Sequence, residues 1–301
     1  MKIAITGSNG FIGSAVVTYL QQKQVTVHRL VRHKAALTAN DIFWHPATKM
    51  IESHKLEGMD GIVHLAAESI YGYWTKKKRE RIWNSRVHGT AFLAGEIAKL
   101  KTPPRFFLSI SASGYYGNRP GEVLREESGP GEGYLPSVCT EWEAAANKVK
   151  EIGVRTIHPR PGLILARHGG ALSTMLPFFK LCLGGPIAGG KHIFSWITLQ
   201  DAVAALYHLM MNEKISGAVN VASPYPVSNK EFVKALGRAI HRPAVLPIPA
   251  FLLRLLYGGL PDETLLTNCH LDPNRLIESG FVFRHEKIDG AMNYVFEKEF
   301  L

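Results

Sequence analysis

The sequence predicts an α/β protein built on a doubly wound parallel sheet, with a smaller and partly helical C-terminal lobe. In the first half, a short apolar strand breaks into a glycine-rich turn, and strands then alternate with helices. In the second half, glycine and proline cluster and helical patterns dominate. Alternation of this kind brings the strands into one parallel sheet with helices on both faces, beside which the helical remainder packs.

The chain opens with a strand, a turn, a helix and a strand within about 30 residues. The strands are Lys2–Thr6 and Val25–Val31, and the turn Gly7–Gly13 carries three glycines. Apolar residues recur at helical spacing between them: Ala15, Val16, Val17 and Leu20. Glycines at such a turn let backbone N–H groups and the positive end of the helix hold a pyrophosphate. The unit predicts a Rossmann-type domain that binds a dinucleotide; the alternative is an ordinary strand–turn–helix corner.

Strands and helices continue to alternate as far as residue 158. Continuous apolar residues predict a buried strand over Gly61–Ala67. Helical spacing of Val87, Ala91, Ala94 and Ala98 predicts a long helix from about Lys76 to Lys99. The other expected elements are a strand over Arg105–Ser111, a loop over about 118–133, a helix over Glu141–Lys150 and a strand over Val154–His158.

The second half changes character. Helical patterns cover about 200–211, 229–240 and 250–257, and no second run of buried parallel strands is obvious. We therefore expect two domains. Residues 1–165 form the dinucleotide-binding domain, and residues 166–301 form a substrate-binding lobe, some segments of which return to the sheet.

Composition limits the class of protein. Of 301 residues, 46% are hydrophobic and 20% are charged, which supports a large core and argues against disorder. No apolar run reaches the roughly 18 residues of a membrane helix, and no signal peptide is expected. Cys139, Cys182 and Cys269 lie far apart, so neither a disulfide framework nor a cysteine zinc site is expected. The dispersed cysteines favour a reducing environment, so we expect a cytoplasmic protein. Because the sequence has no HExxH motif and no acidic calcium loop, we expect no metal.

The net charge is +10, from 35 basic and 25 acidic residues. Such a balance is compatible with binding to nucleic acid. The basic residues are scattered, however, apart from the run Lys76–Arg79 and Arg81, which we interpret as the solvated first part of a helix. We expect a small-molecule substrate as partner, and neither nucleic acid nor a membrane. A basic surface suits an anionic cofactor and substrate.

The end of the second strand bears on the choice of cofactor. NAD-specific folds carry an Asp or Glu there, which accepts hydrogen bonds from the ribose hydroxyls. Here residues 14–40 include no acidic residue, and the strand end carries Arg29, Arg32, His33 and Lys34. Arginine can bind a 2′-phosphate through paired, charge-assisted hydrogen bonds. NADP(H) is therefore predicted over NAD(H), with Arg32 as the first phosphate contact; the alternative is that these are exposed loop cations.

The motifs resemble the extended short-chain dehydrogenase/reductase superfamily, which includes sugar-nucleotide epimerases and dehydratases. This resemblance rests on Thr6-Gly7-x-x-Gly10-x-x-Gly13, Asp60-x-x-x-His64-Leu65-Ala66-Ala67 and Arg86-Val87-His88-Gly89-Thr90. More closely, the chain resembles the atypical epimerase family protein branch (the SDR39U1-like and YfcH-like group). The pieces that carry this closer resemblance, over nearly the whole chain, are Tyr73-Trp74-Thr75, Ser85-Arg86, Ser111-Ala112-Ser113-Gly114-Tyr115-Tyr116-Gly117, Trp142-Glu143, Arg160-x-Gly162, Leu183-Gly184-Gly185-Pro186, Ser195-Trp196-Ile197, Ser223-Pro224-Tyr225-Pro226-Val227 and Pro273-x-Arg275-Leu276.

The resemblance implies which residues contact the cofactor. Those at the pyrophosphate are Gly7, Gly10, Phe11, Ile12 and Gly13, and those at the adenosine end are Val31 and Arg32. Those near the middle of the sheet and the nicotinamide are Leu65, Ala66, Arg86 and Ile164, with Arg86 in the place where typical members carry an asparagine. A homodimer, the assembly typical of the superfamily, is also implied.

The chain departs from the superfamily pattern at the catalytic dyad. Typical members use a Tyr-x-x-x-Lys pair, in which the tyrosine exchanges a proton with the substrate hydroxyl and the lysine lowers the tyrosine pKa. Alignment on Trp142-Glu143 puts Leu135 at the tyrosine position and Cys139 at the lysine position. The usual dyad is therefore absent. For Cys139, a small buried hydrophobic role is favoured over a reactive thiolate.

Other residues are candidates for the chemistry. Ser111 fits the family's serine position best, and Tyr115 or Tyr116 is the candidate acid/base. For the two tyrosines, packing and loop shaping is an alternative of equal weight. The predicted substrate-binding residues are Arg160, Lys191, His192 and Trp196. An internal hydrogen-bonding role for Arg160, and a plain loop-and-core role for the other three, are the alternatives.

Two functions follow from these observations. The first is an NADP(H)-dependent oxidoreductase or epimerase that acts on a small, sugar-like or nucleotide-linked substrate. The second is a regulatory or sensor protein that binds NADPH with little or no catalysis, because the dyad is absent. A nucleic-acid binder rests only on net charge and ranks last. The identity of the substrate does not follow from the sequence.

Overall fold

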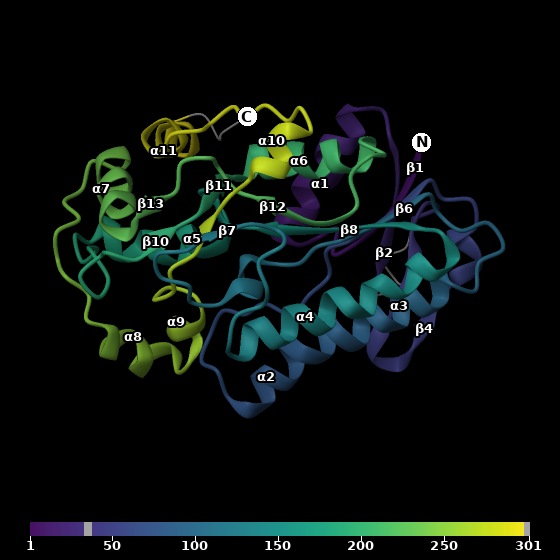
Figure 1. Cartoon of the computed structure of the whole chain (residues 1–301), viewed down its shortest axis with the longest axis horizontal. Helices are drawn as coiled ribbons and strands as arrows, with labels where there is room; N and C mark the ends of the chain where they lie inside the picture. Colours follow the sequence, from purple (N-terminus) through teal and green to yellow (C-terminus); the bar gives the residue numbers. More distant parts are fainter. Residues whose placement is uncertain (33–37, 298–301) are drawn as a thin grey trace.

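A parallel sheet occupies the N-terminal part of the computed structural model, which describes residues 1–32 and 38–297 (Figure 1). Its strands are β1 (Lys2–Thr6), β2 (Thr26–Val31), β3 (Ile42–His45), β4 (Met50–Ile51), β5 (Gly61–His64), β6 (Phe106–Ser109), β8 (Arg155–Pro161) and β12 (Gly217–Val221). Their order is β12-β8-β6-β5-β1-β2-β3-β4, and only the β3–β4 pair is antiparallel among the described strands of this sheet. The order reverses beside β1, where doubly wound sheets bind ligands outside the carboxyl ends of their strands. The predicted fold class is confirmed.

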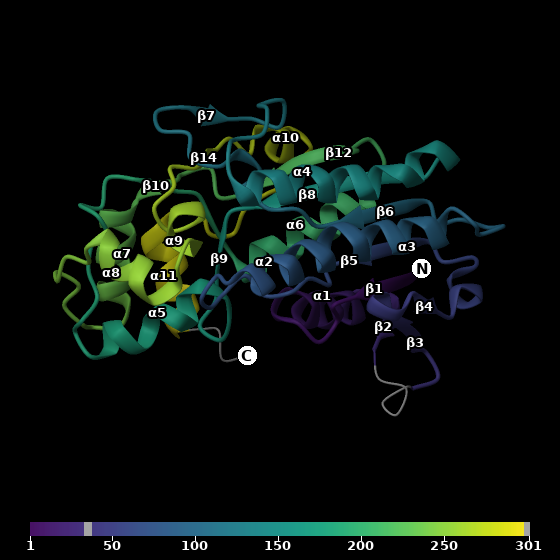
Figure 2. The ribbon, with the colours of Figure 1, turned by 90° about the horizontal axis from the view of Figure 1, so that it is seen from below.

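Helices cover both faces of the sheet (Figures 1 and 2). They are α1 (Phe11–Gln22), α2 (Lys76–Trp83), α3 (Gly89–Ile97), α4 (Tyr134–Asn147) and α6 (Leu199–Met211). On one face, Val16 of α1 and Leu206 of α6 belong to one buried cluster with the strands. On the other face, Leu93 of α3 and Ala146 of α4 belong to a second cluster. Burial of apolar side chains on both faces explains why the strands read as continuous apolar runs.

The C-terminal lobe lies beside the sheet, on the left of Figure 1. Its helices are α5 (Gly170–Lys180), α7 (Asn229–Ala239), α8 (Ala250–Tyr257), α9 (Leu260–Glu263) and α11 (Ile288–Glu297). Helix α10 (Asn274–Glu278) instead packs on the sheet beside β12, where Leu276 joins the buried cluster of α1 and α6. Six short strands of the described chain lie outside the large sheet and form three pairs: β7 (Val123–Leu124) with β14 (His270–Leu271), β9 (Leu163–Leu165) with β11 (Trp196–Thr198), and β10 (Ile193–Phe194) with β13 (Val227–Ser228). Phe179, Trp196 and Phe232 form the core of the lobe. In the described ranges, no helix has both the length and the apolar character needed to cross a membrane.

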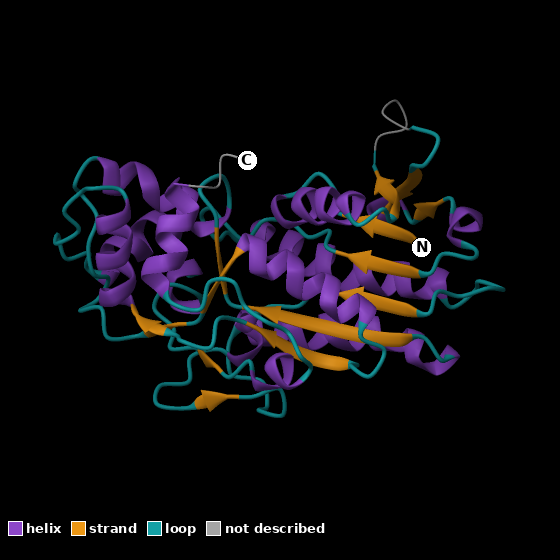
Figure 3. Cartoon of the chain, turned by 90° about the horizontal axis from the view of Figure 1, so that it is seen from above, coloured by secondary structure: helices purple, strands orange, loops and turns teal. Residues whose placement is uncertain are grey.

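Segments of the second half return to the sheet. β12 pairs in parallel with β8 and becomes an edge of the sheet, and α6 precedes it in the chain. Figure 3 shows the strands of the sheet, in orange, lying side by side among the helices. The sequence pattern does not reveal β12 because Asn220 interrupts a short apolar run. The structure accommodates the Asn220 amide, which is fully buried and donates to the carbonyl oxygens of Leu124 and Asp272. The division of the chain at residue 165 stays a prediction.

Helix α4 begins at Tyr134, seven residues before the expected start at Glu141. The carboxylate of Glu263 accepts hydrogen bonds from the backbone N–H groups of Tyr134 and Leu135, both at 2.9 Å. This cap comes from more than a hundred residues away, so the local pattern does not show it. Pro136 lies in the first turn, where proline is tolerated because its missing N–H would be unpaired there.

A π-helical turn, η4 (Asn84–His88), interrupts the long helix expected from Lys76 to Lys99 and separates α2 from α3. Such turns are rare and are often found at functional sites. This one carries Arg86, whose Nη1 donates to the carbonyl oxygen of Glu68 at 2.9 Å. The expected helix is therefore present on both sides of an irregular turn that holds a candidate cofactor residue.

Asp201 in the first turn of α6 connects this helix to the segment before α11. Its fully buried carboxylate accepts from the backbone N–H groups of Arg284, at 3.1 Å, and His285, at 2.9 Å. Asp201→Ala leaves both donors without this acceptor, so we expect the free energy of unfolding to fall by about 2–4 kcal/mol. Urea denaturation measures the change, with the exposed Glu213→Ala as control. Equal midpoints for the two variants would contradict the prediction.

Candidate functional site

The glycines of the first turn form a close-packed backbone cradle at the carboxyl end of β1. Gly7 has φ +70°, and a Cβ there would lie 2.8 Å from the backbone nitrogen of Ala66. A Cβ on Gly13 would lie 2.0 Å from the carbonyl oxygen of Gly7. Both positions therefore require glycine, the first for conformation and space and the second for close contact between turn and helix. The same requirements explain the glycines of a dinucleotide-binding turn.

The first turn of α1 is open to an anion. Gly10 is its N-cap, so no side-chain oxygen accepts from the N–H groups of this turn, and the turn holds no acidic residue. These N–H groups, with the positive end of the helix dipole, suit a pyrophosphate. Gly10, Ile12 and Gly13 thus occupy positions that fit their predicted role. The ring of Phe11 instead packs on the start of α5, where a Cβ on Gly169 would lie 2.3 Å from it.

A buried hydrogen-bonded chain holds the edge of the cradle. The Thr6 hydroxyl accepts from the N–H groups of Leu65 and Ala66, both at 3.1 Å, and lies 2.7 Å from Nδ1 of His64. His64 Nε2 lies 2.9 Å from the Thr90 hydroxyl. Burial lowers the pKa of His64 to about 3. A neutral His64 that accepts from Thr6 must donate to Thr90, which fixes its tautomer and places Leu65 and Ala66 beside Gly7.

The strand end predicted to select the cofactor is described only in part. Arg29 is bound to Asp41 through Nε at 2.8 Å and Nη2 at 2.7 Å, so its charge is matched by a buried carboxylate. Val31 ends β2, and Arg32 follows it as an exposed residue. His33 and Lys34 lie outside the described residues. Among the described residues, Arg32 is therefore the exposed cation that directly follows β2.

A second cluster forms beyond the end of β6, around Glu143 of α4. The Ser111 hydroxyl donates to Glu143 Oε1 at 2.6 Å. Arg160, at the end of β8, donates to both carboxylate oxygens at 2.8 Å. Burial alone would lower the pKa of Arg160, but hydrogen bonds and charge from Glu143 outweigh it and raise the pKa. Arg160 is 3% exposed, so in this structure it serves the internal hydrogen-bonding role rather than an open substrate contact.

The two tyrosines after Ser111 have different environments. Tyr116 is fully buried; its hydroxyl accepts from Arg160 and donates to Asn220, both at 2.8 Å. Burial raises its pKa, although the charge of Arg160 acts against this. The Tyr116 proton is therefore used in an internal hydrogen bond. This agrees with the alternative stated above, in which Tyr116 packs inside the protein. Tyr115 is partly buried, and its ring lies 3.5 Å from the Arg160 guanidinium, which leaves it as the phenol nearer to solvent.

The two positions of the missing dyad lie in apolar or buried surroundings, and Cys139 is the one that lies beside Ser111. Leu135 is buried in a cluster with Trp74, Ile82 and Leu260. Cys139 is 2% exposed, and burial raises the pKa of its thiol to about 12. The partly buried Arg86 guanidinium, whose pKa burial lowers, stacks on Trp142 at 5.1 Å. The charge of Arg86 and a hydrogen bond with Ser111 act to lower the pKa of the Cys139 thiol against the larger effect of burial, so both side chains lie close to Cys139.

The other predicted residues lie farther into the C-terminal part. Ile164 is 9% exposed and pairs with Ile197 between β9 and β11. Lys191 is exposed. His192 is buried against Phe194, and burial lowers its pKa. Trp196 is fully buried and its Nε1 donates to the carbonyl oxygen of Tyr225, so it lies in the core and not along a pocket wall.

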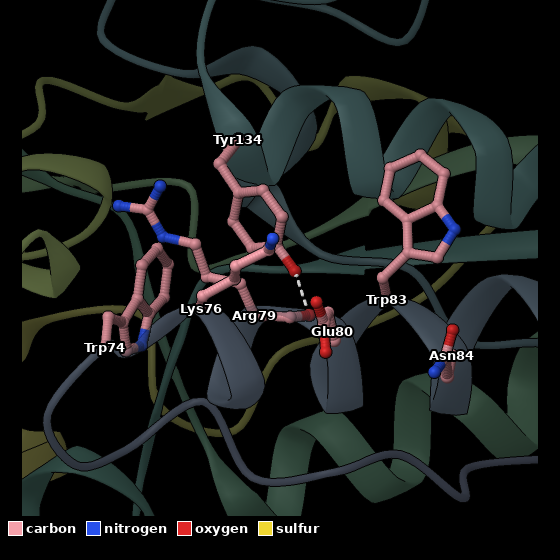
Figure 4. A pocket seen from close by; sticks show the side chains of 7 residues that line it. All are labelled: Trp74, Lys76, Arg79, Glu80, Trp83, Asn84 and Tyr134. Atoms are coloured by element: carbon pink, nitrogen blue, oxygen red, sulfur yellow. Dashed lines mark hydrogen bonds between the residues drawn. The ribbon is translucent and has the colours of Figure 1, made fainter.

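Sequence reasoning missed Glu143 as a site residue, although Trp142-Glu143 is one of the pieces of the resemblance. It also missed a surface hollow of about 560 Å³ on α2 and the start of α4 (Figure 4). In the described part of the chain, no group of three or more His, Cys, Asp or Glu side chains is placed to hold a metal ion. The site is thus a cradle for a dinucleotide beside a Ser–Glu–Arg cluster.

Comparison with known proteins places this arrangement in a family. A model described as the NAD dependent epimerase/dehydratase family matches residues 3–222. The chain belongs to this family. A second model, described as a domain of unknown function (DUF1731), matches residues 248–295. This match begins just before α8. A nicotinamide dinucleotide is therefore the class of cofactor that the cradle of this epimerase/dehydratase family member accommodates.

Related sequences carry the name that the motifs anticipated. The chain is 35% identical over 293 residues to epimerase family protein ML0860 of Mycobacterium leprae, with 97% of this chain and 94% of that protein covered. It is 32% identical over 306 residues to the chloroplastic epimerase family protein SDR39U1 homolog of Arabidopsis thaliana, with 99% and 87% covered. The resemblance to epimerase family proteins is confirmed.

Solved structures of epimerase family proteins agree in fold. The human epimerase family protein SDR39U1, in a crystal structure with NADPH, has a TM-score of 0.89 at 27% identity, over 99% of this chain and 100% of that chain. A nucleoside-diphosphate sugar epimerase of Corynebacterium glutamicum has a TM-score of 0.81 at 30% identity, over 98% and 58%. UDP-glucuronic acid 4-epimerase of Bacillus cereus, at 16% identity and a TM-score of 0.80 over 99% of each chain, shows likeness of fold alone.

The burial of Cys139 predicts a pattern of thiol reactivity. Burial raises the pKa of Cys139 and of Cys269 to about 12, whereas Cys182 is exposed. At about pH 8 the thiols of the buried Cys139 and the partly buried Cys269 are protonated and unreactive, because the thiolate is the nucleophile. Iodoacetamide should therefore label Cys182 in the folded protein and all three cysteines in urea, as mass spectrometry of the peptides would show. Rapid labelling of Cys139 in the folded protein would disprove the assignment as an inert residue.

Proposed function

We propose that the protein is an NADP(H)-dependent oxidoreductase or epimerase that acts on a small, sugar-like or nucleotide-linked substrate. The observation that carries this proposal is the hydrogen bond of 2.6 Å between Ser111 and Glu143, at the same edge of the sheet as the glycine cradle. A polarised hydroxyl beside a dinucleotide site suits the transfer of a proton that accompanies oxidation of an alcohol or reduction of a carbonyl.

The residues of the cradle fit the cofactor. Backbone N–H groups of the first turn of α1 would hold the pyrophosphate, Arg32 the 2′-phosphate, and Arg86 and Ile164 the nicotinamide end. The nicotinamide, when bound, accepts or returns a hydride. The human SDR39U1 structure contains NADPH, which supports NADP(H) over NAD(H) for this chain. Three free thiols support action in a reducing compartment, the cytoplasm.

The Ser111 cluster offers a route for a proton. Glu143 accepts two hydrogen bonds from Arg160 and one from Ser111, so the carboxylate acts only as an acceptor. The Ser111 proton therefore points at Glu143, and its oxygen would accept the proton of a substrate hydroxyl. Ser111 is 4% exposed and neighbours the Cys139 thiol, so a substrate would reach it through a local rearrangement of the site. A proton that leaves the substrate can pass to Ser111 and on to Glu143. Tyr115, partly exposed beside Arg160, is the remaining phenol that could donate to the substrate oxygen.

A specific observation favours the alternative function, an NADPH-binding regulatory or sensor protein. The positions of the catalytic tyrosine and lysine hold Leu135, buried in an apolar cluster, and Cys139, whose thiol has a pKa of about 12. Neither can exchange a proton near neutral pH. If the Ser111–Glu143 route does not replace the dyad, the cradle would bind cofactor without fast turnover.

The choice of cofactor is tested by titration. We expect NADPH to bind at least tenfold more tightly than NADH, and Arg32→Ala to remove most of this preference, because the arginine–phosphate contact is lost. Arg105→Ala is the matched control. Arg105 is exposed and precedes β6, so it lies at the amino ends of the strands, opposite to the edge that carries Arg32. Equal affinity of the wild-type protein for NADH and NADPH would exclude NADP(H) specificity.

Catalysis is tested at Ser111. The wild-type protein should oxidise NADPH or reduce NADP⁺ with one or more members of a panel of carbonyls, alcohols and nucleotide sugars, as absorbance would show. Ser111→Ala should lower kcat at least roughly 100-fold with NADPH affinity unchanged, since it removes the proton route. Ser113→Ala is the matched control. Tight NADPH binding by the wild-type protein, without turnover on any member, would favour the sensor.

A further inference from the structure

The hollow on α2 is outside the cradle and the Ser111 cluster. It is lined by Trp74, Lys76, Arg79, Glu80, Trp83, Asn84 and Tyr134, and its volume is about 560 Å³ (Figure 4). None of these residues belongs to the β1–α1 turn or to the ends of β6 and β8. A volume of this size falls in the range of small-molecule sites, roughly 300–1,000 Å³. The hollow therefore has room for a ligand separate from the cofactor.

Aromatic side chains form walls that the structure holds in place. Trp74 is buried and its Nε1 donates to the carbonyl oxygen of Ile70 at 2.7 Å. The Tyr134 hydroxyl donates to the carbonyl oxygen of Arg79 at 2.5 Å, a contact drawn as the dashed line in Figure 4. The Arg79 guanidinium lies 5.7 Å from the Trp74 ring and 5.5 Å from the Tyr134 ring. Fixed aromatic surfaces suit a planar ring, because little side-chain entropy is lost when it stacks.

The charge around the hollow is positive. Lys76 and Arg79 line it against the single carboxylate of Glu80. Three more cations, Lys77, Lys78 and Arg81, belong to the same helix, and Glu68 binds the last two at 2.9 and 3.2 Å. Two copies of so basic a helix repel each other, which disfavours a symmetric contact of this face with a second copy. An anionic occupant is complementary to it.

We propose that this hollow binds a free nucleotide, as a second nucleotide site separate from the cofactor cradle. The base would stack on the aromatic walls, of which Trp83 and Tyr134 are only partly buried, and the phosphates would meet Lys76 and Arg79. Every base has a π-face, so the site accepts different bases through stacking and charge. The basic run at the start of α2 thereby gains a function beyond solvation.

The test uses the full chain saturated with NADP⁺ and titrated with ADP. Trp83 is the one tryptophan of the five, all described, that is not buried, so quenching of tryptophan fluorescence reports on the hollow. We expect one ADP per chain in addition to NADP⁺ by calorimetry. Lys76→Glu should weaken ADP binding at least tenfold, a change of about 1.4 kcal/mol. Lys77→Glu, one residue away but outside the lining, should change it less than about twofold.

Four results would overturn the proposal. One is no ADP binding at concentrations up to about 1 mM. A second is equal loss in the Lys76 and Lys77 variants, with circular dichroism and NADPH affinity unchanged in both. A third is binding of a single-stranded oligonucleotide that ADP does not displace. A fourth is a dimer in sedimentation that shields Trp83 from acrylamide. Because the proposed function places the substrate at Ser111, ADP bound there would be insensitive to Lys76→Glu, so this test is independent of the proposed catalysis.

Discussion

The ion pair between Arg160 and Glu143 is the contact on which the arrangement of the site depends. It joins the end of β8 to the middle of α4, and through the same two side chains it orients the hydroxyls of Ser111 and Tyr116. Both charges are largely out of water, with side chains 3% and 11% exposed. Removal of one partner from such a pair typically costs about 3–5 kcal/mol, because the other charge is left uncompensated. The intact pair itself adds little net stability, because both charges lost their contact with water on folding. Its contribution is to hold the Ser111 and Tyr116 hydroxyls in place.

The parts of the fold that sequence predicts are those whose cause is local. The glycine turn, the alternation of strands and helices, and α8, which spans Ala250–Tyr257 as expected, depend on patterns within a few residues. The start of α4 depends on Glu263, and β12 depends on carbonyl groups that Asn220 reaches across the fold. Contacts between residues so far apart in the chain leave no periodic signal in a single sequence.

The candidate site shows the same division. Gly7 and Gly13 could be predicted because only glycine satisfies the backbone geometry and close contact there. Ser111 could be placed at a strand end, but its partner Glu143 lies 32 residues away on a helix. Tyr116 and Trp196 have the residue types of a binding site, and the structure buries both completely. Residue type alone does not distinguish a polar aromatic side chain in the core from one that lines a cleft.

The π-turn at η4 lets the two halves of one long helix face in different directions. Successive residues of an α-helix rotate by about 100°, so a single inserted residue changes which side of the axis all later side chains occupy. With the turn, α3 directs Leu93 and Ile97 into the sheet, while α2 keeps its basic face toward solvent and Arg86 meets Trp142. Deletion of one residue here would restore a regular helix and set its two halves out of phase. The π-turn therefore sets the rotation of α2 relative to α3, so that Arg86 reaches Trp142 while the apolar side of α3 stays against the sheet.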